Sequence, residues 1–237
     1  MDNAGYTSLT RLSGLSREMQ TLANNVANAS THGFRKEGVI FSEHVAAIDD
    51  APSLSMASGD VRMTSYLQGS VEPTGGTLDL AIEGEGFFLV ETPEGEALTR
   101  NGAFLPNAAG DLVNADGMRV LDAGGAPIFI PPDAGQISVA RDGTLSIDGQ
   151  PMSQIGLWKP AAPEDIERRS GLLFALKNPP EPVEAPTILQ GHLEGSNVNA
   201  LTEISRLVEV QRAYELGQSF MEKEDQRIRS VLNTLGR

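Results

Sequence analysis

Apolar residues near the start of the chain recur every three or four positions. The intervals alternate between three and four from residue 12 to residue 29, which is the a/d pattern of a helix that packs along one seam. Only Arg17 and Glu18 are ionised within this stretch. The pattern predicts an amphipathic N-terminal helix with a seam of Leu12, Leu15, Met19, Leu22, Val26 and Ala29.

A second apolar stripe near the C-terminus recurs every seven residues without a slip, and it predicts one long helix from about residue 201 to residue 235. Its members are Leu207, Tyr214, Met221, Ile228 and Leu235. We expect the companion stripe of the seam to be Ile204, Gln211, Gln218, Asp225 and Leu232. Polar residues at seam positions can specify register and partner choice. The stripe therefore favours a helix fitted into a larger assembly, with an ordinary helix packed on its own domain as the open alternative.

The middle of the chain, from about residue 70 to residue 190, alternates apolar and polar positions and carries turn signals every eight to twelve residues. Leu78, Leu80 and Ile82 show the alternation, and Asp-Gly pairs supply residues that tolerate positive φ. We therefore predict an α+β fold with a mainly antiparallel β body between discontinuous terminal helices. The expected segments are an N-terminal helix at 1–34, an extended connector at 35–76, a β-rich body at 77–190 and a C-terminal helix at 191–237.

Charge is distributed unevenly along the chain. The formal net charge is -14, which opposes binding to nucleic acid or anionic lipid. Residues 1–31 and residues 201–237 each sum to zero, so the whole excess lies between residues 32 and 200. Such a body repels copies of itself at long range while the ends do not, and this favours assembly through the ends.

Secretion and membrane signals are missing from the sequence. The first thirty residues lack a basic start followed by an apolar run, so we expect no cleaved signal peptide. No stretch approaches the roughly 18 apolar residues of a membrane span, so we expect no direct membrane insertion. The chain has no cysteine, which excludes disulfides and thiol chemistry.

Residues 21–34, TLANNVANASTHGF, place uncharged amides where a solvated helix normally carries charge. Amides both donate and accept hydrogen bonds, so they can satisfy buried polar groups at lower cost than a charge. We expect Asn24 and Asn25 to be buried between subunits. For Asn28, a local role at the helix end stays equally open, with Gly33 as a left-handed stop.

Three ordered blocks of the sequence resemble the signatures of bacterial flagellar rod and hook proteins. Together they span nearly the whole chain, and each is specific. The first block is residues 23–28 with Gly33-Phe34-Arg35; the second is residues 78–82, Gly84, residues 86–88, Thr99-Arg100-Asn101-Gly102 and Asp116-Gly117; the third is residues 193–199 with Gln211-Arg212-Ala213-Tyr214.

The resemblance implies a structural subunit of the flagellar basal-body rod that transmits motor torque across the periplasm. It implies pairing of the two terminal helices as a coiled-coil-like stalk, and assembly with copies of itself and other rod proteins. It also implies unfolded export through the flagellar type III apparatus, without a cleaved signal peptide. The opening residues 1–7 are most similar to proximal rod proteins, with distal rod or other axial proteins as the alternative.

The same resemblance and the helix seams suggest a set of residues at the subunit interface. They are Leu12, Leu15, Met19, Leu22, Asn24, Asn25, Val26, Asn28, Gly33, Phe34, Ser196, Asn197, Val198, Asn199, Leu207, Gln211, Tyr214, Met221 and Ile228.

Catalytic and metal sites find little support in the sequence. Asp79, Glu83 and Glu85 are close in sequence, and paired carboxylates can hydrolyse glycosides, but the glycines around Glu85 suggest a bend. Residues 142–148 suggest a hairpin more than a calcium loop. The histidines lack metal-ligand spacing. We expect no catalytic residue, metal or cofactor, and a secreted glycan-binding module or glycoside hydrolase stays a weaker alternative.

Overall fold

The computed structural model describes residues 2–48, 51–162 and 165–235. The chain divides into two compact units. The first, which we call the helical unit, comprises Met1–Ala29, Lys36–Tyr66 and Val198–Arg237. The second, the β unit, comprises Ser30–Arg35 and Leu67–Asn197.

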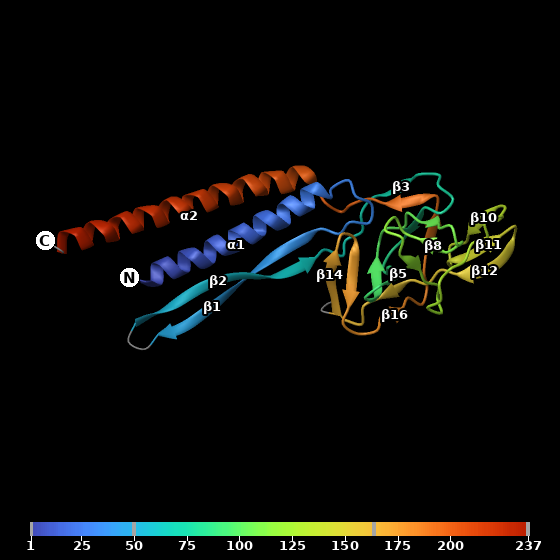
Figure 1. The fold of residues 1–237 in the computed structure, drawn as a ribbon, viewed down its shortest axis with the longest axis horizontal. Coiled ribbons are helices and arrows are strands. Elements are labelled where there is room, and N and C mark those ends of the chain that lie inside the picture. Colours follow the sequence, from blue (N-terminus) through green and yellow to red (C-terminus); the bar gives the residue numbers. More distant parts are fainter. Residues whose placement is uncertain (1, 49–50, 163–164, 236–237) are drawn as a thin grey trace. The chain divides into compact units, whose positions relative to one another are not determined.

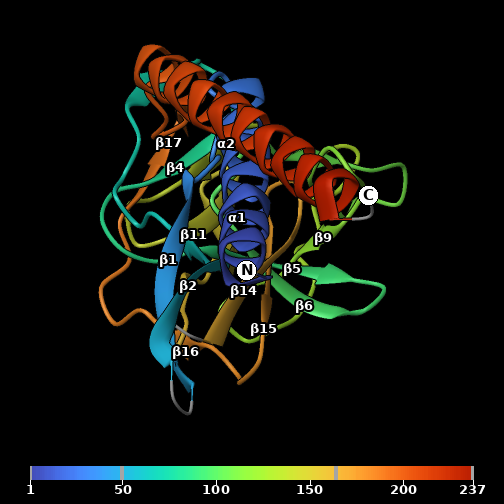
Figure 2. The same cartoon turned by 90° about the vertical axis from the view of Figure 1, so that its left-hand side faces the viewer.

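The helical unit is built on two helices, as predicted. They are α1 (Asp2–Ala27) and α2 (Ala200–Leu235), and they lie side by side in opposite directions (Figure 1, Figure 2). Leu15 and Leu22 of α1 are buried against Val210 of α2. Half-buried side chains extend this contact at Met19, Leu207, Ala213 and Tyr214.

The predicted second stripe of α2 was wrong. Ile204, Gln211 and Gln218 are exposed in the structure. The residues that complete the seam with Leu207 and Tyr214 are instead Val210, which is 2% exposed, and Gly217. An added Cβ at Gly217 would lie 2.7 Å from Leu12 Cδ2, so the two helices approach closely there. The seam is therefore shifted by one residue from the predicted stripe. This shift buries Val210 and leaves the glutamine amides in water, which costs less than burying the amides.

A long hairpin completes the helical unit. Strands β1 (Glu37–Ile48) and β2 (Ala51–Thr64) pair antiparallel from Glu37 opposite Thr64 to Ile48 opposite Ala51, and both contact α1 (Figure 1). The sequence indicated an extended connector at 35–76. Within that range the two extended arms pair with each other, which satisfies backbone groups that a single arm would leave to water. The segment boundaries stay a prediction.

The β unit consists of antiparallel sheets. The largest has the strand order β14-β15-β6-β5-β9-β8-β7, and a three-stranded sheet has the order β10-β11-β12. Pairs β13-β16, β17-β4 and β18-β3 complete it. The strands are β3 (Val71–Pro73), β4 (Leu80–Ile82), β5 (Phe88–Thr92), β6 (Gly95–Thr99), β7 (Leu105–Pro106), β8 (Leu112–Val113), β9 (Arg119–Val120), β10 (Ile137–Val139), β11 (Thr144–Ile147), β12 (Gln150–Gln154), β13 (Trp158–Lys159), β14 (Ile166–Ser170), β15 (Leu173–Leu176), β16 (Glu181–Pro182), β17 (Ile188–Gln190) and β18 (His192–Glu194).

Alternation along these strands builds two hydrophobic clusters. The larger includes the fully buried Leu80, Ile82, Phe88, Val90 and Leu145, and the smaller includes Phe87 and Leu89, which alternate with Phe88 and Val90. Asp148 and Gly149 form the two-residue turn between β11 and β12, with φ of 51° and 78°. A turn of this kind matches the twist of the paired strands. The predicted fold class, an antiparallel β body with paired terminal helices, is confirmed.

Among the residues described, neither helix has a stretch apolar and long enough to cross a membrane.

Candidate functional site: the meeting point of the three signature blocks

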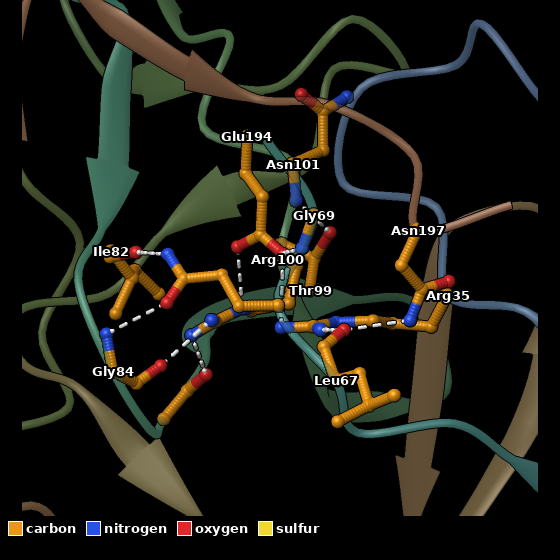
Figure 3. Close-up of polar contacts among 12 residues, drawn as sticks. Arg35, Leu67, Gly69, Ile82, Gly84, Thr99, Arg100, Asn101, Glu194 and Asn197 are labelled. Carbon is orange, nitrogen blue, oxygen red and sulfur yellow. Dashed lines mark hydrogen bonds and ion pairs between the residues drawn. The ribbon is translucent and has the colours of Figure 1, made fainter. Parts of the chain in front are cut away.

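Three segments far apart in sequence meet around one carboxylate in the β unit (Figure 3). Glu194, at the end of β18, lies between two arginines that come from the other two signature blocks. Glu194 Oε1 is 3.0 Å from an Arg35 terminal nitrogen, and Glu194 Oε2 is 2.9 Å from Arg100 Nε. We call these three residues the Glu194 cluster.

The Glu194 cluster is deeply buried. The side chains of Arg35, Arg100 and Glu194 are 3%, 1% and 1% exposed. Glu194 Oε1 also accepts a hydrogen bond from the Gly69 backbone N–H at 3.0 Å. Two cations and one anion are therefore packed where water cannot screen them.

Backbone carbonyls complete the coordination of both guanidinium groups. Arg100 donates to Gly84 O at 2.8 Å and to Gly86 O at 2.5 Å, and Arg35 donates to Leu67 O. Burial lowers the pKa of Arg100 to about 10, and the neighbouring Glu194 carboxylate counteracts this. Burial also lowers the pKa of Arg35, again opposed by Glu194. Both groups keep their charge at neutral pH, so Glu194 is the carboxylate that compensates them.

The first signature block packs against the second where the backbone of Gly33 approaches that of Asn101. Gly33 has φ of 72°, and an added Cβ would lie 2.4 Å from Asn101 N, so no larger residue fits. Its N–H donates to Glu194 O at 2.7 Å. Because α1 already ends at Ala27, Gly33 does not terminate the helix as expected; it allows a close contact inside the β unit.

Phe34 is buried beside this contact. The Arg168 guanidinium lies 4.7 Å from the Phe34 ring and 4.7 Å from the Phe174 ring, a cation–π arrangement. Asn197 donates from its backbone to Phe34 O at 3.3 Å and from its side chain to Leu67 O at 2.7 Å. Phe34 and Asn197 therefore help to hold the chain's own β unit together.

A second polar cluster lies in the helical unit, and we call it the Asn25 cluster. The fully buried Asn25 side chain donates to Glu37 O and to Glu203 Oε2, each at 2.8 Å, and accepts from Glu37 N at 2.9 Å. Lys36 forms an ion pair with the other oxygen of Glu203. One amide thus joins α1, β1 and α2.

The amide row of α1 is used within the chain. Asn25 was expected to be buried between subunits. It is buried, but by β1 and α2 of the same chain, so its amide is covered without a second subunit. Asn24 is exposed and donates to Glu37 Oε2 at 3.3 Å. Asn28 donates to Asn24 O at 2.9 Å, which is the local role at the helix end that the sequence left open.

The remaining expected interface residues divide by exposure. Gln211 and Ile228 are exposed on α2. Asn199 caps α2, since its Oδ1 accepts from Thr202 N at 3.2 Å. Half-buried positions are Leu12, Met19, Val26, Ser196, Val198, Leu207, Tyr214 and Met221, and Leu15 and Leu22 are buried. A contact with another subunit stays a prediction for all of them.

The acidic residues weighed as catalytic candidates are not gathered into a buried site. Glu83 and Glu85 are exposed on either side of Gly84, whose φ of 96° produces the expected bend. Asp142 accepts from Thr144 N at 3.0 Å within the β10–β11 turn, as a hairpin requires. Within the described part of the chain, no group of three or more His, Asp or Glu side chains could hold a metal ion.

Arg35, Arg100 and Glu194 lie within the three sequence motifs but were not predicted as site residues. Glu37 and Glu203 were not predicted as site residues either. A signal existed for Arg100 and Glu194, because each is the only Asp, Glu, Lys or Arg in residues 97–110 and 185–202, respectively, and an isolated ionised residue is expected to pair if it is buried.

Comparison with known proteins gives matches in the same three regions. A family model described as "Flagella basal body rod protein" matches residues 6–35. One described as "Flagellar hook protein FlgE/F/G D1 domain" matches residues 81–147, and "Flagellar basal body rod FlgEFG protein C-terminal" matches residues 189–235.

Curated relatives match over the full length. The chain is 37% identical to "Flagellar basal-body rod protein FlgF" of Mesorhizobium japonicum, covering 100% of this chain and 99% of that protein. It is also 37% identical to the protein of the same name from Caulobacter vibrioides, with the same coverage. "Flagellar basal-body rod protein FlgG" of Bacillus subtilis is 29% identical, over 96% of this chain and 97% of that protein.

Proposed function

The chain belongs to the flagellar basal-body rod protein family, and on this premise we propose that it is a proximal rod subunit built in through α1 and α2. Proteins of this family are structural components of the flagellar basal body, where they assemble with other rod components. The observation that carries the proposal is the full-length likeness at 37% identity to proteins named FlgF, against 29% for one named FlgG. The distal rod is therefore the second candidate.

Charge supports assembly through the helices. Residues 1–31 and 201–237 are each neutral, whereas the excess of -14 lies between them. Helices of neighbouring subunits can approach without long-range repulsion, while the acidic β units favour separation. We propose that exposed members of the expected interface, Asn24, Gln211 and Ile228, meet neighbouring subunits, and that the buried members shape the helices that present them.

The two polar clusters support a role in carrying force. The chain leaving α1 and the chain entering α2 are both anchored at Glu194, through Arg35 and through Gly33 N–H. Inside the helical unit, Asn25 joins both helices to β1. Close-packed side chains resist sliding because movement opens voids. Torque applied to assembled helices then reaches the β unit through anchored chain segments.

Export of the chain and its lack of catalytic activity are two further parts of the proposed function. We propose that the chain is exported unfolded by the flagellar export apparatus, without a cleaved signal peptide, and that the rod it joins spans the periplasm. We propose no catalytic activity. Polysaccharide turnover abolished by Glu83→Gln would contradict this.

Complementation of a deletion strain tests the proposal. The intact gene should restore swimming, and a variant lacking residues 2–27 should not, because α1 supplies half of the seam. Trp158 fluorescence of the purified truncated chain should still show a folded β unit. Swimming restored by the truncated variant would contradict assembly through the helices.

A further inference from the structure

The seam face of α2 continues beyond the part that α1 covers. The spacing of three and four that runs through Val210, Tyr214 and Gly217 continues to Ile228 and Val231. Yet Ile228 and Val231 are 40% and 45% exposed, and the adjacent Leu232 is 63% exposed. We call these last three residues the overhang.

Helix lengths explain why the overhang is uncovered. The helices run in opposite directions, and Ser8 of α1 lines the same cavity as Phe220 of α2. Since α1 begins at Asp2, six residues before Ser8, it reaches to about residue 226 of α2. α2 continues to Leu235, which adds about 14 Å of helix at 1.5 Å per residue (Figure 1).

An apolar groove lies between the same two helices. It has a volume of about 460 Å³ and is lined by Ser8, Arg11, Leu12, Leu15, Ala213, Leu216, Gly217 and Phe220. Leu216 and Phe220 form an exposed rim, at 73% and 50%. Gly217 lies at the base, where Leu12 of α1 packs against it, and a knob from a third helix would insert between Leu216 and Phe220 above it.

We propose that the overhang of one copy of this chain packs into the groove of a second copy. The contact continues the α1–α2 seam, because it covers the next apolar residues of the same face. A chain cannot fill its own groove: Gly217 and Val231 are fourteen residues apart on one helix, about 21 Å.

Charge does not oppose this pairing. Residues 222–229, which lead into the overhang, carry three acidic and three basic side chains, and Glu224 and Asp225 form ion pairs with Arg227 and Arg229 of the same helix. Residues 201–237 sum to zero, so approaching copies meet no net repulsion there.

The contact is heterologous, since overhang and groove are different surfaces on each copy. A heterologous contact that does not close on itself extends into an open assembly. The inference rests on the proposed function and deepens it by naming the two surfaces that join successive copies.

Cysteine cross-linking tests the contact in the full chain, which has no native cysteine. The double variant Leu216→Cys/Leu232→Cys carries one thiol at the groove and one on the overhang. Within one chain the two are sixteen residues apart on α2, about 24 Å, beyond the roughly 7 Å limit for a disulfide. Oxidation should give a ladder of dimers, trimers and longer species. The control Gln211→Cys/Leu232→Cys moves one thiol outside the groove. Its yield of cross-linked species should be about tenfold lower, because the proposed contact does not hold this thiol close to the thiol at position 232 of the second copy.

A matched pair of charge variants in the double-cysteine chain tests the apolar contact itself. Ile228→Glu places a charge on the seam face and should reduce the ladder by about tenfold or more. Ser230→Glu adds the same charge on the opposite face and should leave it unchanged. Equal yields in the two variants, a ladder in the Gln211 control, or products that stop at dimers would each overturn the proposal.

Swimming separates this inference from the proposed function. In a deletion strain, the gene with Ile228→Glu should fail to restore motility and the gene with Ser230→Glu should restore it. Full swimming with both, together with no ladder, overturns the overhang contact but leaves the rod function intact. Full swimming of the deletion strain itself overturns the function.

Discussion

Replacing Glu194 by Gln should destabilise the β unit strongly. The change keeps the size of the side chain but removes the carboxylate that pairs with both Arg35 and Arg100, which are 3% and 1% exposed. Removing one partner of a buried ion pair typically costs about 3–5 kcal/mol, because the remaining charge is buried and uncompensated. That is a large share of the roughly 5–15 kcal/mol by which domains are stable.

Fluorescence can follow this loss in the β unit alone. The chain has a single tryptophan, Trp158 in β13, so tryptophan emission reports the β unit. Ellipticity at 222 nm is dominated by α1 and α2 and reports the helical unit. At about 2–4 °C per kcal/mol, a loss of about 3–5 kcal/mol should lower the fluorescence midpoint by about 6–20 °C.

The control variant is Glu181→Gln. Glu181 is 57% exposed and lies 3.9 Å from Lys159, and exposed pairs of this kind contribute about 1 kcal/mol or less. Its midpoint should move by only a few degrees. If Glu194→Gln shifts the fluorescence midpoint no more than Glu181→Gln does, the account of Glu194 as the compensating charge is refuted.

Further substitutions test the backbone contact and the amide cluster. Gly33→Ala and Gly75→Ala have the same backbone conformation, with φ of 72° and 74°, but only Gly33 has backbone atoms within 4 Å of the added Cβ. Gly75→Ala should lower the free energy of unfolding by about 1–2 kcal/mol, and Gly33→Ala should lower it by about 1–3 kcal/mol more. Trp158 fluorescence in urea measures both losses, and equal losses would refute the close approach. Asn25→Asp should destabilise the helical unit by about 2–4 kcal/mol by ellipticity, because it removes two donated hydrogen bonds and faces Glu203 with a second carboxylate. The same amide-to-acid change at Asn199, an exposed helix cap, should be nearly neutral, and a similar loss at both sites would contradict the assignment.

The elements that could be predicted from the sequence are those that depend on local pattern. The heptad stripe predicted a helix at about 201–235, and α2 spans Ala200–Leu235. Turn residues such as Asp148-Gly149 marked hairpins because positive φ is a property of the residues themselves. Periodicity gives the spacing of a seam but not which face meets the partner, and this is why Gln211 was chosen over the neighbouring Val210.

The Glu194 cluster was beyond local pattern. Arg35, Arg100 and Glu194 are separated by 65 and 94 positions, and nothing in one sequence pairs a particular arginine with a particular glutamate. The amide of Asn25 was expected to be buried, but its partners Glu37 and Glu203 also depend on tertiary packing. Resemblance to rod proteins marked the three blocks without indicating that they meet.

We propose that this chain forms a section of the rod and is joined to it through its terminal helices. Electron cryotomography of basal bodies from a strain lacking the gene tests this role. We predict that the shaft stops short of its normal length, that the intact gene restores the missing section, and that a gene lacking residues 2–27 does not. Basal bodies of normal length and form in the deletion strain would contradict the account.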